Sequence, residues 1–202
     1  MKTMAKLTGN NLKKANILLF DIVILFDKYN IVYHLEGGTL LGIVRDNKLL
    51  PWDHDIDISI PSSEIKKIIK IKKILEKKYK IRLHYFDKNR HIFKSKGLRL
   101  IKVKNKFTSL LKNISPFLFR KYDIVLDIFV KYSDNKDVYW EASNKTMRVS
   151  LKYYNSYEEI EYNNYLYKVP NNYKEYLQEK YGDWKTPIKE WSCSENEKTV
   201  ID

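Results

Sequence analysis

The chain has 202 residues, of which 44% are hydrophobic, so it is long enough to bury the core of one globular domain. Its single cysteine, Cys193, excludes an internal disulfide and a cysteine-based zinc cluster, and it indicates a reducing compartment. The net charge of +13 is uneven: residues 62–122 hold 20 Lys and Arg against 3 Asp and Glu, a net of +17. This segment predicts either contact with a polyanion, such as a membrane surface, a phosphorylated glycan, a nucleotide phosphate or a nucleic acid, or a solvated lysine-rich helix face.

No targeting segment stands out at the start of the sequence. The first sixteen residues are polar, and Asp21 interrupts the apolar run that follows, ILLFDIVILF. That run is also shorter than the ~20 apolar residues of a membrane-spanning helix. We therefore expect a cytoplasmic protein without a signal peptide or transmembrane span, which could lie at the periphery of a membrane.

The first elements in chain order are a helix, a strand and a glycine turn. Apolar residues at three- and four-residue spacing predict a helix over 11–29, capped by Asn10 or Asn11, and IVYHL at 31–35 reads as a short strand. The Gly37-Gly38-Thr39 turn then opens a short helix, expected from Thr39 to Arg45, a geometry that presents backbone N–H groups to a phosphate. Arg45 either clamps a phosphate or pairs with Asp46 or another carboxylate.

An acidic strand follows this turn. Asp53, Asp55 and Asp57 alternate with His54, Ile56 and Ile58, so the three carboxylates would share one face, about 6.6 Å apart along the strand, and His54 would face away. Carboxylates that repel one another at this spacing favour a bound cation. This stretch is the strongest indication of an enzyme in the sequence.

The middle of the chain predicts a lysine-faced helix and several strands. The helix is expected over 62–80, and short strands over 81–86, 92–94 and 98–103, whereas residues 105–120 fit either helix or loop. Residues 123–132, DIVLDIFVKY, form a clear strand in which Asp127 interrupts an apolar pattern. A buried carboxylate is costly unless it is paired or metal-bound, so Asp127 predicts a third site residue; the alternative is an edge-strand Asp that faces water.

The last third predicts a hairpin and a short helix. The hairpin covers 158–169 with Asn163-Asn164 at its turn, and the helix covers 171–181 and ends at Gly182. After Ile188 the sequence is polar, and we expect a mobile tail. No linker or repeat divides the chain, so the prediction is one domain over 1–202 with its core in about 11–188.

Three blocks of sequence resemble one known family. HLEGGTLLGIVRDNKLLPWDHDIDI, LDIFV and VPNNYKEYLQEKYGDWKTP are similar, in order, to the patterns GGTLLG-x-x-R with IPWDDDIDI, IDIF, and Y-L-x-x-x-Y-G-x-W-x-x-P of the LicD family, which includes the fukutin-related proteins. The resemblance covers roughly residues 20–190 and is weakest between 62 and 120. It implies an α+β nucleotidyltransferase-like fold with a mixed sheet flanked by helices.

The resemblance also implies a function. Family members transfer a phosphorylated alcohol, such as phosphocholine or ribitol phosphate, from a CDP-activated donor to a glycan acceptor, with Mg²⁺ or Mn²⁺. The metal-binding and catalytic acids carry over onto Asp55, Asp57 and Asp127, with Asp53 in support. The phosphate-binding residues would be Gly37, Gly38, Thr39 and Arg45, and Trp184 would help to shape the site.

One position departs from the family pattern, because His54 replaces the middle acid of the IPWDDDIDI block. Two other functions remain open: a nucleotidyltransferase that acts on a nucleic acid or a small molecule, and a non-catalytic basic binding module. No RNA-binding signature occurs in the basic segment, which makes a nucleic acid the less favoured partner. The intact set of carboxylates argues against the non-catalytic module.

Overall fold

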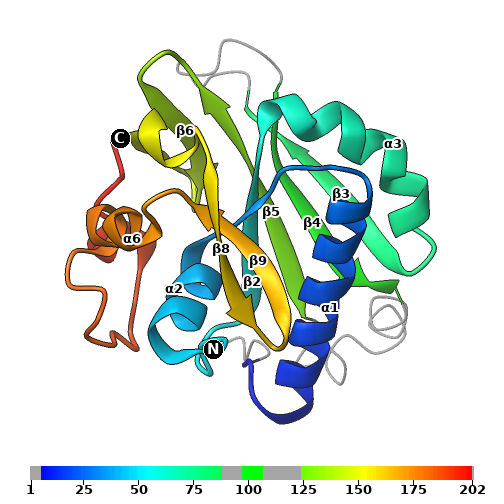
Figure 1. Cartoon of the computed structure of the whole chain (residues 1–202), viewed down its shortest axis with the longest axis horizontal. Coiled ribbons are helices and arrows are strands. Elements are labelled where there is room, and N and C mark those ends of the chain that lie inside the picture. Colours follow the sequence, from blue (N-terminus) through cyan, green and yellow to red (C-terminus); the bar gives the residue numbers. More distant parts are fainter. Residues whose placement is uncertain (1–5, 88–96, 107–123, 202) are drawn as a thin grey trace.

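A computed structural model describes residues 6–87, 97–106 and 124–201 as one α+β domain in which helices flank a mixed sheet (Figure 1). The sheet strands are β1 (His34–Leu35), β2 (Asp55–Pro61), β3 (Tyr79–Tyr85), β4 (Leu98–Asn105), β5 (Val125–Ser133), β6 (Asp137–Ala142) and β7 (Lys145–Ser150). A separate hairpin is formed by β8 (Tyr157–Tyr162) and β9 (Tyr165–Pro170). The helices are α1 (Gly9–Lys28), α2 (Gly37–Asp46), α3 (Ile65–Leu75), α6 (Tyr173–Tyr181) and α7 (Cys193–Asn196), with 3₁₀ turns at Ser62–Glu64 and Leu151–Tyr153. The fold class that the sequence predicts is confirmed.

The strand order of the sheet is β1-β2-β5-β4-β3, with β6 continuing from β5 and β7 from β6. β2 and β5 run parallel, and the other described neighbours run antiparallel. The parallel pair sets Asp57 directly beside Asp127. Two strands that are about seventy residues apart in sequence therefore bring their acids together.

Helix α1 covers the sheet with an apolar stripe, as the spacing predicts. Its buried residues are Ala15, Leu18, Leu19, Ile22, Val23 and Phe26. They belong to the same core as Ile56, Ile58 and Ile60 of β2, which leaves Asp55 and Asp57 on the opposite face of that strand. The predicted cap is wrong, because Thr8 occupies the N-cap position and the Asn11 side chain donates to the Lys6 carbonyl instead.

Helix α3 is shorter than its sequence pattern suggests. It ends at Leu75, and Tyr79, which the helical pattern would place inward, begins strand β3. The Tyr79 hydroxyl donates to Asp21 of α1, and Lys78 forms an ion pair with the same carboxylate. This contact with α1 explains why the chain turns into the sheet before residue 80. The strand expected over 92–94 and the undecided stretch 105–120 lie largely or wholly outside the described residues, as does the first residue of the strand expected from 123.

In the part of the chain that the structure describes, two hairpins have two-residue turns, and the sequence predicted only one of them. Asn163 and Asn164 join β8 to β9 with positive φ at both positions, which confirms that prediction. Ser143 and Asn144 join β6 to β7 in the same way, with φ of 51° and 61°. The alternation of Val138 and Trp140 before this turn was a signal for the missed hairpin.

The tail after Ile188 packs against the domain, so the prediction of a mobile tail is wrong. Thr199 and Val200 run along β7: the Arg148 N–H donates to the Thr199 carbonyl at 2.9 Å, and Val200 bridges Met147. Glu197 and Thr199 are buried. Polarity alone misled the prediction, because these polar side chains find partners inside the fold.

Candidate active site

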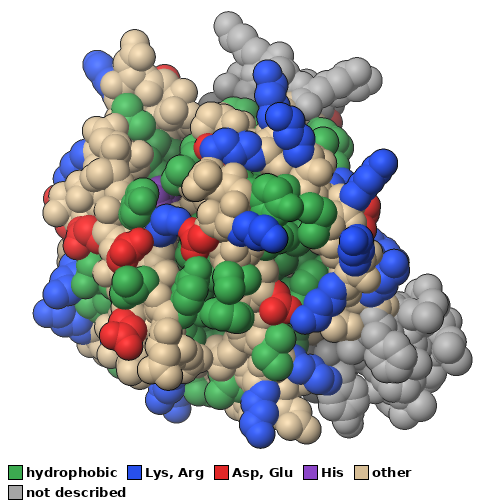
Figure 2. Space-filling model, turned by 45° about the vertical axis from the view of Figure 1, so that its right-hand side comes forward, with side chains coloured by type: hydrophobic (Ala, Val, Ile, Leu, Met, Phe, Trp, Pro, Cys, Tyr) green, Lys and Arg blue, Asp and Glu red, His purple; other side chains and the backbone are tan. Residues whose placement is uncertain are grey.

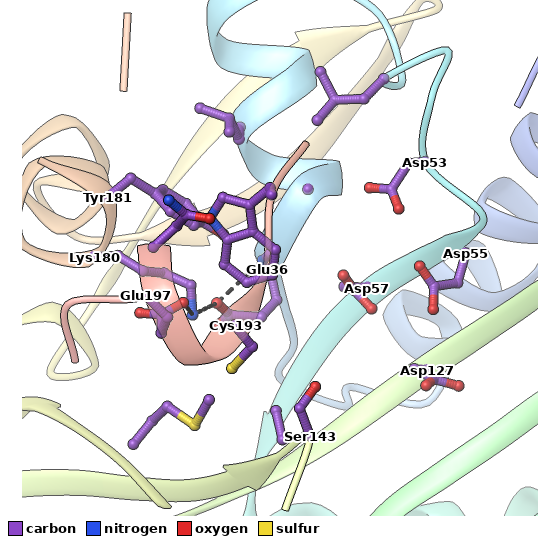
Figure 3. A pocket seen from close by; sticks show the side chains of 18 of the residues that line it. Glu36, Asp53, Asp55, Asp57, Asp127, Ser143, Lys180, Tyr181, Cys193 and Glu197 are labelled. Carbon is purple, nitrogen blue, oxygen red and sulfur yellow. Dashed lines mark hydrogen bonds and ion pairs between the residues drawn. The ribbon is translucent and has the colours of Figure 1, made fainter. Parts of the chain in front are cut away.

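Three carboxylates converge where β2 and β5 lie side by side. Asp55, Asp57 and Asp127 each place one oxygen within 4.8 Å of the others (Figure 3). Asp127 is buried. Its Oδ2 accepts from Lys102 Nζ at 2.7 Å, and its Oδ1 has no hydrogen-bond partner among the described residues. The structure thus brings together the three acids that the sequence singles out.

Crowding makes these acids hard to ionise together. Burial, reinforced by repulsion from Asp53, raises the pKa of Asp55 to about 6. Burial and then repulsion from Asp55, Asp53 and Asp127 hold the pKa of Asp57 well above its usual value. Burial also raises the pKa of Asp127, although Lys102 opposes this effect. A cation among the oxygens would remove the repulsion.

The donor set fits a hard divalent cation. Carboxylate oxygens are the ligands that Mg²⁺ and Mn²⁺ prefer, and the unpartnered Oδ1 of Asp127 offers a buried lone pair that the described protein groups do not use. The residues that would hold such an ion are therefore Asp55, Asp57 and Asp127.

The glycine pair lies against the acids. Gly37 and Gly38 are the first residues of α2, so the helix begins two residues earlier than the expected Thr39. A Cβ on Gly38 would lie 2.1 Å from Asp53 Oδ2, and one on Gly37, whose φ is +56°, would lie 2.4 Å from Asp57 Oδ2. Only glycine lets the carboxylates approach this helix end so closely, where the helix dipole favours negative charge.

Thr39 does not line the cavity as a phosphate ligand would. It is buried, and its Oγ1 accepts a hydrogen bond of 2.9 Å from the Asp57 backbone N–H. Its side chain joins α2 to β2 and so fixes the position of Asp57. The phosphate contact predicted for Thr39 would therefore involve its backbone N–H, and it stays a prediction.

Arg45 adopts the carboxylate pairing that the sequence left open. Its Nε donates to Asp46 Oδ1 at 3.0 Å and its second terminal nitrogen donates to Asp46 Oδ2 at 2.9 Å. The other terminal nitrogen donates to the Trp184 carbonyl at 3.4 Å. Arg45 borders the cavity, but in this state it joins α2 to the segment after α6.

The acids open into a cavity of about 890 Å³. Figure 3 shows the carboxylates on one side, facing Lys180, Tyr181, Cys193 and Glu197 across the opening. The β6–β7 hairpin and the tail supply walls that the sequence did not predict. Trp184 lines the cavity, and so do Tyr181 and Asp183 of the same block. The volume suits a ligand of nucleotide size.

His54 does not face away from the acids as strand alternation predicts. β2 begins only at Asp55, so Asp53 and His54 precede the regular strand. The backbone N–H of His54 donates to Asp53 Oδ1 at 2.9 Å, and His54 borders the cavity. The departure from the family pattern thus lies at the edge of the site.

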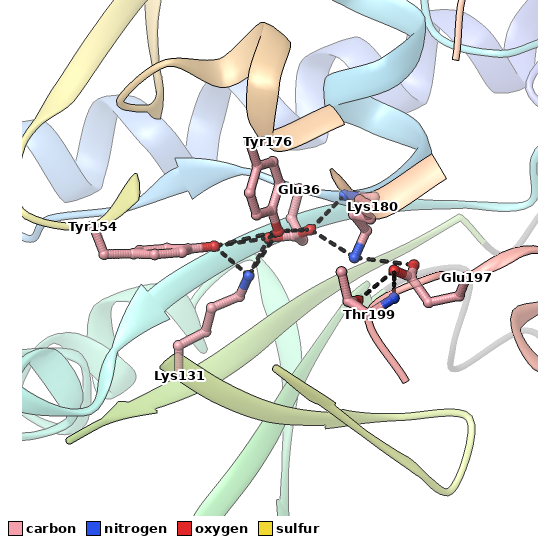
Figure 4. Close-up of polar contacts among 8 residues, drawn as sticks. Glu36, Lys131, Tyr154, Tyr176, Lys180, Glu197 and Thr199 are labelled. Carbon is pink, nitrogen blue, oxygen red and sulfur yellow. Dashed lines mark hydrogen bonds and ion pairs between the residues drawn. The ribbon is translucent and has the colours of Figure 1, made fainter. Parts of the chain in front are cut away.

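A buried polar network is centred on Glu36, the residue directly before the glycine pair (Figure 4). The sequence did not predict this network. Glu36 caps α2 by accepting from the Gly37 N–H at 3.1 Å, and its carboxylate is 1% exposed. Lys131 and Lys180 both form ion pairs with it, the latter at 3.2 Å. The Tyr176 hydroxyl lies 2.7 Å from one of its oxygens.

This network connects four distant parts of the chain. Lys131 belongs to β5, Lys180 to α6, and Glu197 of the tail pairs with Lys180 at 3.2 Å. Burial acts to raise the pKa of Glu36, but the two lysines and their hydrogen bonds outweigh it and hold the pKa well below its usual range. The only sequence signal was the position of Glu36 directly before the glycine pair.

Among the described helices, none combines the length and apolar character that crossing a bilayer requires.

Comparison with known proteins identifies a family for this arrangement. The model described as "LicD/FKTN/FKRP, nucleotidyltransferase domain" matches residues 30–172, which is more than half of the chain. This range contains the three acids and the glycine pair.

Individual relatives match over shorter segments. Lipopolysaccharide cholinephosphotransferase LicD of Haemophilus influenzae is 33% identical over 72 residues, which cover 34% of this chain and 26% of that protein. The human ribitol 5-phosphate transferase FKRP is 54% identical over 28 residues, 14% of this chain and 6% of that protein. The match therefore spans about a quarter or less of these curated relatives. A crystal structure of the lincosamide antibiotic adenylyltransferase LnuA, with lincomycin bound, aligns with a TM-score of 0.47 at 18% identity and covers 85% of each chain.

Proposed function

Because the chain belongs to the LicD/FKTN/FKRP nucleotidyltransferase-domain family, we propose that it transfers a phosphorylated alcohol from a CDP-activated donor to a glycan hydroxyl. The observation that carries this proposal is the convergence of Asp55, Asp57 and Asp127, with oxygens within 4.8 Å of one another, in the lining of a cavity of about 890 Å³. The names of two relatives, a cholinephosphotransferase and a ribitol 5-phosphate transferase, support a phospho-alcohol as the transferred group.

The three acids would hold Mg²⁺ or Mn²⁺. When bound, such an ion neutralises phosphate charge and lowers the pKa of a neighbouring hydroxyl. The remaining contributions come from the chain itself. The Gly37 N–H is already bonded to the Glu36 carboxylate, so the backbone N–H groups of Gly38 and Thr39, in the first turn of α2, would donate to a donor phosphate.

The reaction balances as a single displacement. The acceptor oxygen attacks the phosphorus that carries the alcohol, the bridging P–O bond to the cytidylate breaks, and CMP leaves. The acceptor proton passes to a carboxylate of the site, and Asp127 would take this role because its Oδ1 accepts no hydrogen bond from the described residues. Lys102, 2.7 Å from Asp127 Oδ2, would stabilise that carboxylate and fix its orientation.

Substrate profiling tests the proposal. The purified chain is incubated with CDP-choline, CDP-ribitol or CDP-glycerol and a glycan acceptor, with and without EDTA, and CMP release is measured. We expect turnover with at least one donor and its loss with EDTA. Incorporation of a labelled nucleoside triphosphate into RNA or a small molecule, without turnover of any CDP-alcohol, would instead assign a nucleotidyltransferase.

Matched variants connect the activity to the acids. Asp57→Asn keeps the shape of the side chain, and we expect turnover to fall by about a thousandfold and the heat of Mn²⁺ binding to disappear in calorimetry. Glu159→Gln removes an exposed carboxylate on β8 and should change neither. If Mn²⁺ binding and turnover both survive in Asp57→Asn, the three acids are not the active site. If the unmodified chain neither binds Mn²⁺ nor turns over any donor, the chain fits a non-catalytic binding module.

A further inference from the structure

Two neighbouring helices expose an unusual combination of side chains on the same side of the domain. α1 and α3 lie on the same side of the sheet (Figure 1), and contacts at their ends hold them near each other: Lys67 of α3 donates to the carbonyl of Asn30, just after α1, at 2.6 Å, and Lys78, just after α3, pairs with Asp21 of α1. Their outer faces form what we call the α1–α3 surface, whose exposed residues are Lys13, Lys14, Ile17, Phe20, Ile24, Lys28, Lys66, Lys67, Ile69, Lys70, Lys73 and Ile74. Figure 2 turns this side toward the viewer and shows green hydrophobic side chains among blue lysines.

The outer face of α1 is apolar where a solvated helix is normally polar. Ile17, Phe20 and Ile24, at spacings of three and four residues, form one stripe opposite the buried face, and they are 55%, 40% and 44% exposed. Lys13 and Lys28 continue the stripe at its two ends. Phe20 also makes an edge-to-face contact with Tyr165 of β9, at 5.2 Å between the ring centres, but all three side chains keep two fifths or more of their surface exposed.

The outer face of α3 complements this stripe with charge. Every exposed residue of α3 is a lysine or an isoleucine. Lys66, Lys70 and Lys73 form the central stripe, and none of them has an ion-pair partner within the described part of the chain. Ile69 and Ile74 flank this stripe on its two sides and are 44% and 39% exposed. The surface is therefore basic and apolar at once, with its acids, Asp21 and Glu76, already paired to lysines.

We propose that the α1–α3 surface docks on an anionic lipid bilayer, where the isoleucines and Phe20 enter the headgroup boundary and the lysines contact the lipid phosphates. Lysines beside apolar side chains suit this environment because their aliphatic stems bury while their ammonium groups reach the charged surface. A second copy of the chain fits poorly, since two lysine stripes would repel each other. A nucleic acid fits less well than lipid, because the apolar residues are mostly aliphatic and offer little for base stacking.

Vesicle co-sedimentation of the full chain tests the proposal without donor or acceptor. We expect binding to vesicles of phosphatidylcholine with one quarter phosphatidylserine, little binding to phosphatidylcholine alone, and a loss of binding as salt increases. Binding to neither vesicle, or equal binding to both, would overturn the proposal.

Two variants of exposed residues separate the charged and apolar contributions. Replacing the three central lysines of α3 should lower the partition coefficient about a hundredfold, because each lysine near an anionic surface contributes about a fivefold factor; the variant is Lys66→Gln/Lys70→Gln/Lys73→Gln. Removing two apolar side chains should lower it about tenfold; the variant is Phe20→Ser/Ile24→Ser.

A matched control removes the same charge elsewhere. It replaces three exposed lysines of other elements, as Lys136→Gln/Lys152→Gln/Lys174→Gln, and should bind as the unmodified chain does. Circular dichroism checks that each variant folds. If the control loses as much vesicle binding as the α3 variant, the effect comes from net charge alone, and the proposal for the α1–α3 surface is wrong. Binding of RNA that the α3 variant abolishes, in the absence of vesicle binding, would assign the surface to a nucleic acid instead.

Discussion

Glu36 is the residue whose replacement tests the polar network most directly. In Glu36→Gln, the buried ammonium of Lys131 loses its carboxylate partner, whereas Lys180 keeps Glu197. Removing one member of a buried ion pair costs about 3–5 kcal/mol. Because the amide can still accept from Tyr176, we expect a loss of about 3 kcal/mol in the free energy of unfolding, measured by urea denaturation at neutral pH.

The pH dependence gives this prediction a sign. The pKa of Glu36 in the folded chain lies well below the ordinary value of 4.5. The ionised carboxylate therefore stabilises the fold above pH 4.5, and this stabilisation is lost as the pH falls below that value. The gap in stability between the unmodified chain and Glu36→Gln should shrink in more acidic solution. It should also shrink as the pH rises towards about 8, because burial lowers the pKa of Lys131 to about 8 and the ion pair is lost when Lys131 gives up its proton.

A double variant controls for the loss of the residue itself. Glu36→Gln/Lys131→Met removes both buried charges, and it should recover part of the stability even though Lys131 Nζ also lies 3.7 Å from the centre of the Trp140 ring. Glu159→Gln, an exposed acid, should change the free energy of unfolding by less than about 0.5 kcal/mol. Equal stability of Glu36→Gln and the unmodified chain would refute the assignment of Glu36 as the centre of the network.

Three further predictions concern the acids. Thr39→Val removes the acceptor of the Asp57 N–H at 2.9 Å, so stability should fall by about 1–3 kcal/mol in urea denaturation, and an unchanged midpoint would contradict the positioning role. Gly38→Ala places a methyl group 2.1 Å from Asp53 Oδ2, so turnover should fall more than stability does, and full activity would show that Asp53 is free to move. Protons compete with a cation for Asp55, whose pKa is about 6, so the calorimetric affinity for Mn²⁺ should weaken as the pH falls through that value; affinity that is independent of pH would exclude Asp55 as a ligand.

Much of the site was predictable because its signals are local. Alternation of Asp and Ile predicts β2 and its two faces, and a glycine pair before an apolar run predicts the start of a helix near the acids. The asparagine turn of β8–β9 is equally local, since both residues tolerate positive φ. Errors occurred where local pattern competed with a distant contact: α3 ended early where Asp21 contacts Tyr79, and the polar tail packed because Lys180 pairs with Glu197.

The sequence by itself therefore determined the family resemblance and the alternation that places Asp55 and Asp57 on one face of a strand. It also identified Asp127 as a candidate site residue, because a carboxylate interrupts an apolar strand there. Only the tertiary structure decided that Asp127 lies beside Asp57 and that Lys102 contacts it. It also decided that Thr39 positions the strand and that Glu36 meets lysines from β5 and α6. Periodicity acts within one element, whereas these contacts depend on the register between strands and on packing between segments far apart in the chain.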